Sequence, residues 1–82
     1  MTNYRSFMPM QSVDEVLDIY QTYGDIVINR LAYSVEEFME TIQRQELIVL
    51  KAEEKRGASS MEVRARREYL HYLYSVQFAL GV

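Results

Sequence analysis

The spacing of apolar and polar positions predicts α-helix over most of the chain. In the last third, apolar side chains recur every three or four residues, which places them on one face of a helix. This predicted core stripe consists of Ala65, Tyr69, Tyr72, Leu73, Val76 and Leu80. Ser59 with Glu62 is typical of a capping box at the start of this helix, and Gly81 is a typical C-terminal stop because glycine adopts the left-handed conformation without a steric penalty.

A second apolar row runs along the same predicted helix and leaves only a narrow polar strip. Its members are Val63, Leu70, Tyr74 and Phe78. A helix that is apolar around most of its circumference must be covered on two sides. Because a chain of 82 residues has few elements for this purpose, we expect the second row to form an interface between copies of the chain, giving a homo-oligomer.

The first predicted helix covers residues 13–23. Ser12 with Glu15 forms a second capping-box pattern, and Gly24 supplies the stop. Residues 1–11 have no periodicity, and Pro9 favours extended backbone before it. We therefore expect an irregular N-terminal arm over residues 1–11 and a single three-helix domain over residues 12–82.

Residues 25–55 allow two interpretations. Ile26, Val27 and Ile28 are β-branched and alone favour a strand. Apolar residues from Ile28 to Val49 nevertheless stay on one helical face, which favours one long helix from residue 26 to about residue 55. A third capping-box pattern, Ser34 with Glu37, marks a point at which this helix could break.

The turn at residues 55–60 contains a glycine and two serines and predicts a reversal of the chain between two helices. The expected fold class is therefore all-α. A short N-terminal helix is followed by a long antiparallel two-helix hairpin, and the chains associate as a helical oligomer.

The composition indicates the compartment in which the chain is expected and the interactions that can stabilise its fold. A domain of 82 residues is small enough to be only marginally stable alone, and a partner subunit would supply additional burial. The chain has no cysteine, so it contains no disulfide or thiolate metal site, and a cytoplasmic location is expected. The N-terminus lacks a signal-peptide pattern, and no segment approaches the roughly 20 apolar residues of a membrane span.

The net charge of −3 conceals an asymmetry along the chain. Residues 1–50 carry three basic and eight acidic side chains, whereas residues 51–82 carry six basic and four acidic ones. The acidic first half disfavours general affinity for nucleic acid, and the basic groups are local to the last third.

Those basic groups suggest a ligand site at the turn between the last two helices. The candidate residues for an anion or a nucleotide are Lys55, Arg56, Gly57, Ser59, Ser60, Arg64 and Arg67. Backbone N–H groups at a helix start, hydroxyls and guanidinium groups together can hold a phosphate. The same residue types also suit an ordinary turn, and no phosphate-cradling glycine loop accompanies them.

Glu46 and His71 are the remaining candidates for chemistry. Glu46 lies on the predicted apolar face of the long helix, so we expect a hydrogen bond from Tyr69 or Tyr72, and by the same register an ion pair between Glu53 and Arg66. A catalytic carboxylate is the alternative for Glu46. His71 has no convergent partners for a metal site or a catalytic triad, so we expect neither a cofactor nor enzymatic activity.

These observations favour a small non-enzymatic binding protein that acts as an inhibitor or adaptor through protein–protein contacts. Its size and acidic helical character are similar to those of many phage and mobile-element proteins that bind host components, although no motif identifies a partner. The alternative function is sequestration of a nucleotide or another small phosphate-containing ligand at residues 55–60 and the flanking arginines. Neither a membrane nor nucleic acid is an expected partner.

Overall fold

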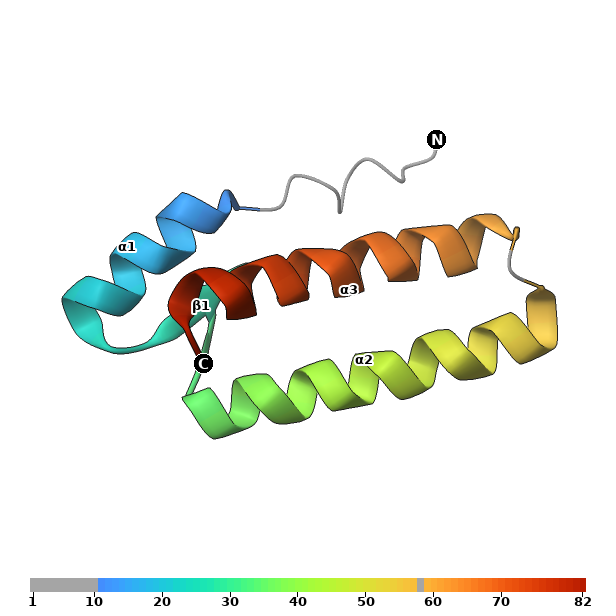
Figure 1. Ribbon diagram of the computed structural model, residues 1–82, viewed down its shortest axis with the longest axis horizontal. Coiled ribbons are helices and arrows are strands. Elements are labelled where there is room, and N and C mark those ends of the chain that lie inside the picture. The colour runs from blue at the N-terminus through green and yellow to red at the C-terminus, as the bar shows by residue number, and fades with distance from the viewer. Residues whose placement is uncertain (1–10, 58) are drawn as a thin grey trace.

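The computed structural model describes residues 11–57 and 59–82. Over these residues the chain forms three helices and one two-stranded antiparallel sheet (Figure 1). In chain order the elements are α1 (Val13–Tyr23), β1 (Ile26–Ile28), β2 (Leu31–Tyr33), α2 (Val35–Arg56) and α3 (Met61–Leu80). The structure is thus mostly helical, as predicted. The irregular N-terminal arm was expected over residues 1–11, and of these only Gln11 lies within the described residues.

The predicted first helix is confirmed, with Ser12 as its N-cap and Gly24 as its C-cap, although only the Ser12 half of the predicted capping box is present. The Ser12 hydroxyl accepts a hydrogen bond from the Glu15 N–H at 3.1 Å and so satisfies a donor that the first turn leaves free. At the other end Gly24 has φ 84° and its N–H donates to the Tyr20 carbonyl. Local chemistry therefore fixes both limits of α1.

The prediction of one long helix from residue 26 is wrong, because residues 26–33 form a β-hairpin. Ile26 pairs with Tyr33 and Ile28 with Leu31. The two turn residues, Asn29 and Arg30, have φ values of 51° and 71°. Such left-handed backbone cannot continue a right-handed helix, and it is what a two-residue hairpin turn requires. The β-branched sequence of β1 accordingly forms a strand.

The long helix of the structure begins at the capping box that marked the break. The Ser34 hydroxyl accepts from the Glu37 N–H at 3.1 Å, and Glu37 Oε1 accepts from the Ser34 N–H at 2.9 Å. The start of α3 differs from the prediction by one residue. Ser60 rather than Ser59 is the N-cap, and its hydroxyl accepts from the Val63 N–H at 3.1 Å.

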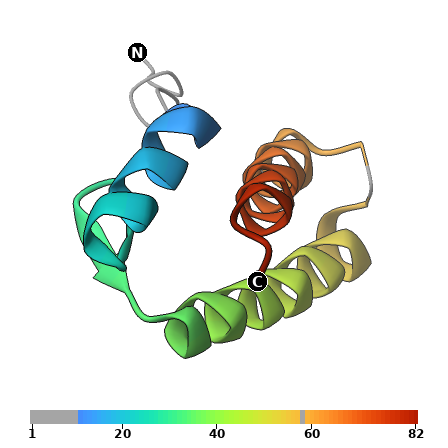
Figure 2. The same cartoon turned by 60° about the vertical axis from the view of Figure 1, so that its left-hand side comes forward.

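The helix α3 organises the molecule, because it packs against both α1 and α2. In Figure 1, α2 and α3 lie side by side and run in opposite directions, and Figure 2 shows α1 and α2 on different sides of α3. The hairpin joins these layers, since β1 contacts α1 and β2 contacts α2. The core cluster consists of Val16, Ile26, Ile28, Phe38, Ile42, Val49, Leu70, Leu73 and Val76.

The second apolar row of α3 is divided between core and surface. Val63 and Leu70 are buried within the chain itself, with exposures of 0% and 8%. This corrects their assignment to an interface between copies of the chain. Tyr74 and Phe78 lie on the surface.

The described helices include none with the length and apolar character needed to cross a bilayer.

Candidate functional site

The predicted anion-binding residues do not converge on the turn. Arg56 Nε forms an ion pair with Glu62 Oε1 at 3.0 Å, and Arg67 forms an ion pair with Glu53 on α2. The Ser60 hydroxyl is already used as the helix cap. Three of the predicted ligand groups are thus engaged within the chain itself.

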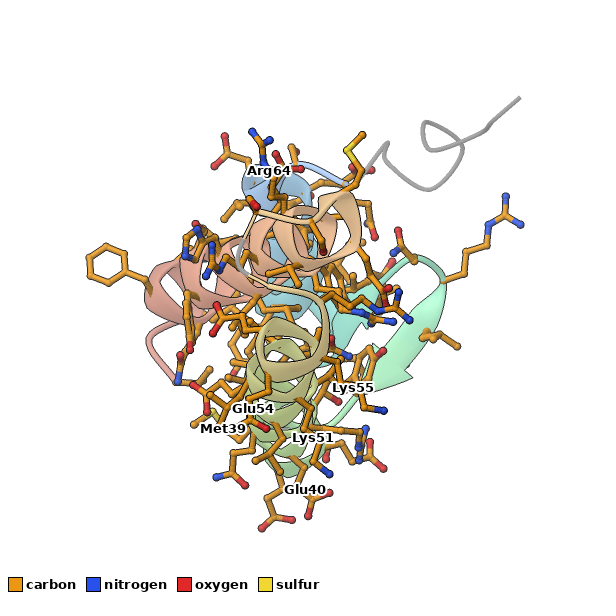
Figure 3. The ribbon with its side chains drawn as sticks, turned by 90° about the vertical axis from the view of Figure 1, so that its right-hand side faces the viewer. Met39, Glu40, Lys51, Glu54, Lys55 and Arg64 are labelled. Atoms are coloured by element: carbon orange, nitrogen blue, oxygen red, sulfur yellow. The ribbon has the colours of Figure 1, made fainter. Side chains whose placement is uncertain are left out.

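The other predicted groups are spread around the end of the helix pair. Figure 3 views this end of the molecule and shows Arg64 at the outer side of α3, away from Lys55 on α2. Gly57 and Ser59 are exposed. The structure therefore brings Lys55 and Arg56 together at the end of α2, but it does not bring Arg64 to the same place.

A shallow depression of about 390 Å³ lies beside the end of α2 and gathers a different set of basic groups. Its lining residues are Ile48, Lys51, Ala52, Glu54, Lys55, Arg56, Glu62 and Arg66. Positions 48, 51, 52 and 55 share one helical face, a spacing that was visible in the sequence. Arg66 was expected to meet Glu53, but the register of the two helices gives Glu53 to Arg67 instead.

Glu62 connects the two arginines of this depression. Its carboxylate accepts a hydrogen bond from Arg66 Nε at 3.2 Å and forms an ion pair with Arg56, whose Nε lies 3.0 Å from Glu62 Oε1. Arg66 uses one of its five N–H groups in this hydrogen bond, and among the described residues the terminal nitrogens of both arginines have no hydrogen-bond partner. The arrangement holds two guanidinium groups, one from each helix, next to a single carboxylate.

A second surface lies along the other side of the helix pair and begins at Glu46. Tyr74 Oη donates a hydrogen bond to Glu46 Oε2, so the predicted donors Tyr69 and Tyr72 are incorrect. Glu46 is exposed rather than placed on the buried face. The hydrogen bond to Glu46 raises the pKa of Tyr74 above its ordinary value of 10.0. It also fixes the position of the Tyr74 ring.

Apolar side chains extend this surface on both helices. Leu50 follows Glu46 by one turn of α2, and Phe78 follows Tyr74 by one turn of α3, so all four lie along the same side of the pair. Phe78 is 89% exposed and Leu50 is 52% exposed. We call Glu46, Leu50, Tyr74 and Phe78 the outer face. Its C-terminal part borders a shallow depression formed by Tyr74, Gln77, Phe78, Gly81 and Val82.

Tyr69, Tyr72 and His71 were also candidates for contacts or chemistry in the last helix. Burial raises the pKa of Tyr69 and Tyr72, and the Tyr72 hydroxyl is buried without a hydrogen-bond partner in the described part of the chain. His71 is exposed, and its ring centroid lies 6.3 Å from that of Tyr74. Across residues 11–57 and 59–82, no group of three histidine or acidic side chains is placed to hold a metal ion.

Comparison of the chain with models of protein families, with curated proteins and with solved structures finds no match.

Proposed function

We propose that this chain is a non-enzymatic binding protein, an inhibitor or adaptor that acts through protein–protein contacts, and that it forms a homo-oligomer through the outer face. The observation that supports this proposal most strongly is the exposure of Phe78, which is 89% accessible at the C-terminal end of α3. An aromatic side chain left in water gains free energy when a partner covers it, about 1.5–3 kcal/mol for full burial.

The other residues of the outer face favour the same function. Tyr74 and Leu50 add apolar area on the same side of the helix pair, and aromatic residues are enriched at protein interfaces. The hydrogen bond between Tyr74 and Glu46 orders the tyrosine before any partner arrives. Preordering of this kind lowers the entropic cost of association. In this proposal the acidic side chains between residues 14 and 40, which lie outside the outer face, are available to a different protein partner.

The mass of the protein in solution tests the proposed oligomer. We expect multi-angle light scattering to find an oligomer for the wild type and a monomer for Phe78→Glu, because a carboxylate cannot be buried unpaired in an apolar contact. Tyr23→Glu is the matched control, since Tyr23 is also an exposed aromatic residue but lies at the end of α1.

We expect the Tyr23→Glu protein to keep the wild-type mass. A wild-type monomer at every concentration tested would refute the homo-oligomer. Equal dissociation by both substitutions would refute the assignment of the interface to the outer face. Far-ultraviolet circular dichroism should show that each variant remains helical.

A further inference from the structure

We propose a second binding site, separate from the outer face, in the depression beside the end of α2. The ligand class is a small molecule that carries a phosphate group and an apolar or aromatic body, as a nucleoside monophosphate does. The depression measures about 390 Å³, within the range of pockets that accept such molecules. It takes Lys55 and Arg56 from the site predicted at the turn and replaces Arg64 and Arg67 with Lys51 and Arg66.

The charges around the depression favour an anion. Four basic and two acidic side chains line it, whereas the whole chain carries a net charge of −3. Lys51 and Lys55 are one helical turn apart, and Figure 3 shows them toward the same side of α2. Among the described residues, neither lysine takes part in an ion pair. Their ammonium groups are therefore available to a phosphate.

The arginine pair supplies directional donors from both helices. Glu62 contacts Arg56 and Arg66 through their Nε atoms, and within residues 11–57 and 59–82 no other group pairs with their terminal nitrogens. A guanidinium group donates to phosphate oxygens through such paired N–H groups, and these charge-assisted hydrogen bonds are stronger than neutral ones. Glu62 therefore positions the two arginines but also opposes an anion with its own charge.

The apolar part of the ligand has a place in the same depression. Ile48 and Ala52 line it between the charged side chains. Ala52 is buried and Ile48 is half-buried, so both belong to the packed side of α2 rather than to a mobile rim. A base or another flat apolar group would cover these side chains while the phosphate meets the lysines and arginines. This combination favours a phosphorylated small molecule over a bare phosphate ion.

Titration of the ¹⁵N-labelled protein with adenosine monophosphate, followed by amide chemical shifts, tests the site. We expect saturable shifts at residues 48–56 and 62–66, and no saturation with adenosine. Lys51→Gln combined with Lys55→Gln should weaken binding at least about fivefold, because two charge contacts are lost. Arg64→Gln is the matched control and should bind like the wild type, since it removes a positive charge from α3 outside the depression.

Glu62→Gln gives an independent expectation in the opposite direction. The glutamine amide has a single acceptor oxygen, so it can keep the contact with one arginine and releases the other. The negative charge that opposes the phosphate also disappears, so binding should tighten by roughly twofold or more. Unchanged or weaker binding in this variant would contradict the proposed role of Glu62. Loss of binding in Arg64→Gln with retention in the double lysine variant would instead place the ligand at the turn.

No saturation by the nucleotide in either the wild type or Glu62→Gln would overturn the site altogether. Phe78→Glu should retain the titration, so the failure of this site and the failure of the proposed oligomer can be told apart. The double lysine variant should fold like the wild type, because both lysines are exposed and neither forms an ion pair within the described chain. Its circular dichroism spectrum should match that of the wild type.

Discussion

Arg30 shows most directly how a single residue shapes this fold. It occupies the second position of the hairpin turn with φ 71°, a conformation that glycine adopts freely and that an arginine adopts at a steric cost. Asn29 precedes it with φ 51°, and its N–H donates to Gln11 Oε1 at 2.8 Å. Asparagine tolerates left-handed backbone better than most residues, so the cost is concentrated at Arg30.

We therefore expect Arg30→Gly to raise the free energy of unfolding by roughly 0.5–1 kcal/mol, because the steric cost of left-handed arginine exceeds the entropy that glycine loses on folding. Urea denaturation monitored by circular dichroism measures the change. Asn29→Gly is the comparison and should gain less. An equal or lower stability of Arg30→Gly would show that the arginine makes a compensating contact.

At the scale of the elements, the helix caps give a test of where α3 begins. Ser60 accepts from the Val63 N–H, whereas Ser59 lies in the exposed turn before it. Ser60→Ala should lower the free energy of unfolding by about 1 kcal/mol, the usual effect of losing an N-cap hydroxyl. Ser59→Ala should change it little. Chemical denaturation of both variants decides between them, and the reverse order would restore the capping box first predicted at Ser59.

The elements that the sequence predicted correctly are those with local signals. Ser12, Gly24 and Gly81 act on backbone groups within four residues, so these helix ends could be inferred without knowledge of the fold. Ser34 gave the same kind of signal, but the prediction treated it only as a possible break in a longer helix. The β-hairpin was missed because the apolar residues from Ile28 onward also fit a helical period. Two left-handed residues without glycine gave no turn signal of comparable strength.

The site was predicted less well because it depends on the register between α2 and α3. The turn between the helices was predicted in the right region, but the pairing of residues across it was not. The prediction paired Glu46 with Tyr69 or Tyr72 and Glu53 with Arg66. The structure pairs Glu46 with Tyr74 and Glu53 with Arg67. One position along a helix turns a side chain by 100°, so a small error in register moves a charge to another surface. The basic face of α2 at Lys51 and Lys55 was nevertheless present in the spacing.

At the scale of the whole molecule, three tyrosines link stability to alkaline pH. The pKa values of Tyr69, Tyr72 and Tyr74 are all raised in the folded chain above 10.0. The folded state therefore holds these protons more tightly than the unfolded state, so their contribution is complete below pH 10 and is lost as pH rises through the folded pKa values. The free energy of unfolding should therefore decrease as the pH rises above about 10.

Urea denaturation in a series of buffers from pH 8 to pH 11.5 measures this dependence. Tyr72→Phe should lose stability less steeply above about pH 10, because one of the three linked groups is removed. It should also be at least as stable as the wild type at neutral pH, since the Tyr72 hydroxyl is buried without a partner in the described structure. Tyr23→Phe, at an exposed position, should follow the wild-type curve. Identical slopes for all three proteins would contradict the linkage.

The central place of α3 has a consequence for the order in which the chain folds and opens. Contacts between α2 and α3 join neighbouring segments, whereas contacts between α1 and α3 close a loop through the hairpin and the whole of α2. Loop closure costs more entropy for distant segments, so docking of α1 is expected to follow the pairing of α2 with α3. By the same reasoning, α1 is the helix that can detach while the neighbouring helices α2 and α3 stay paired. Its departure would uncover the side of α3 on which it packs while the pairing of α2 with α3 persists.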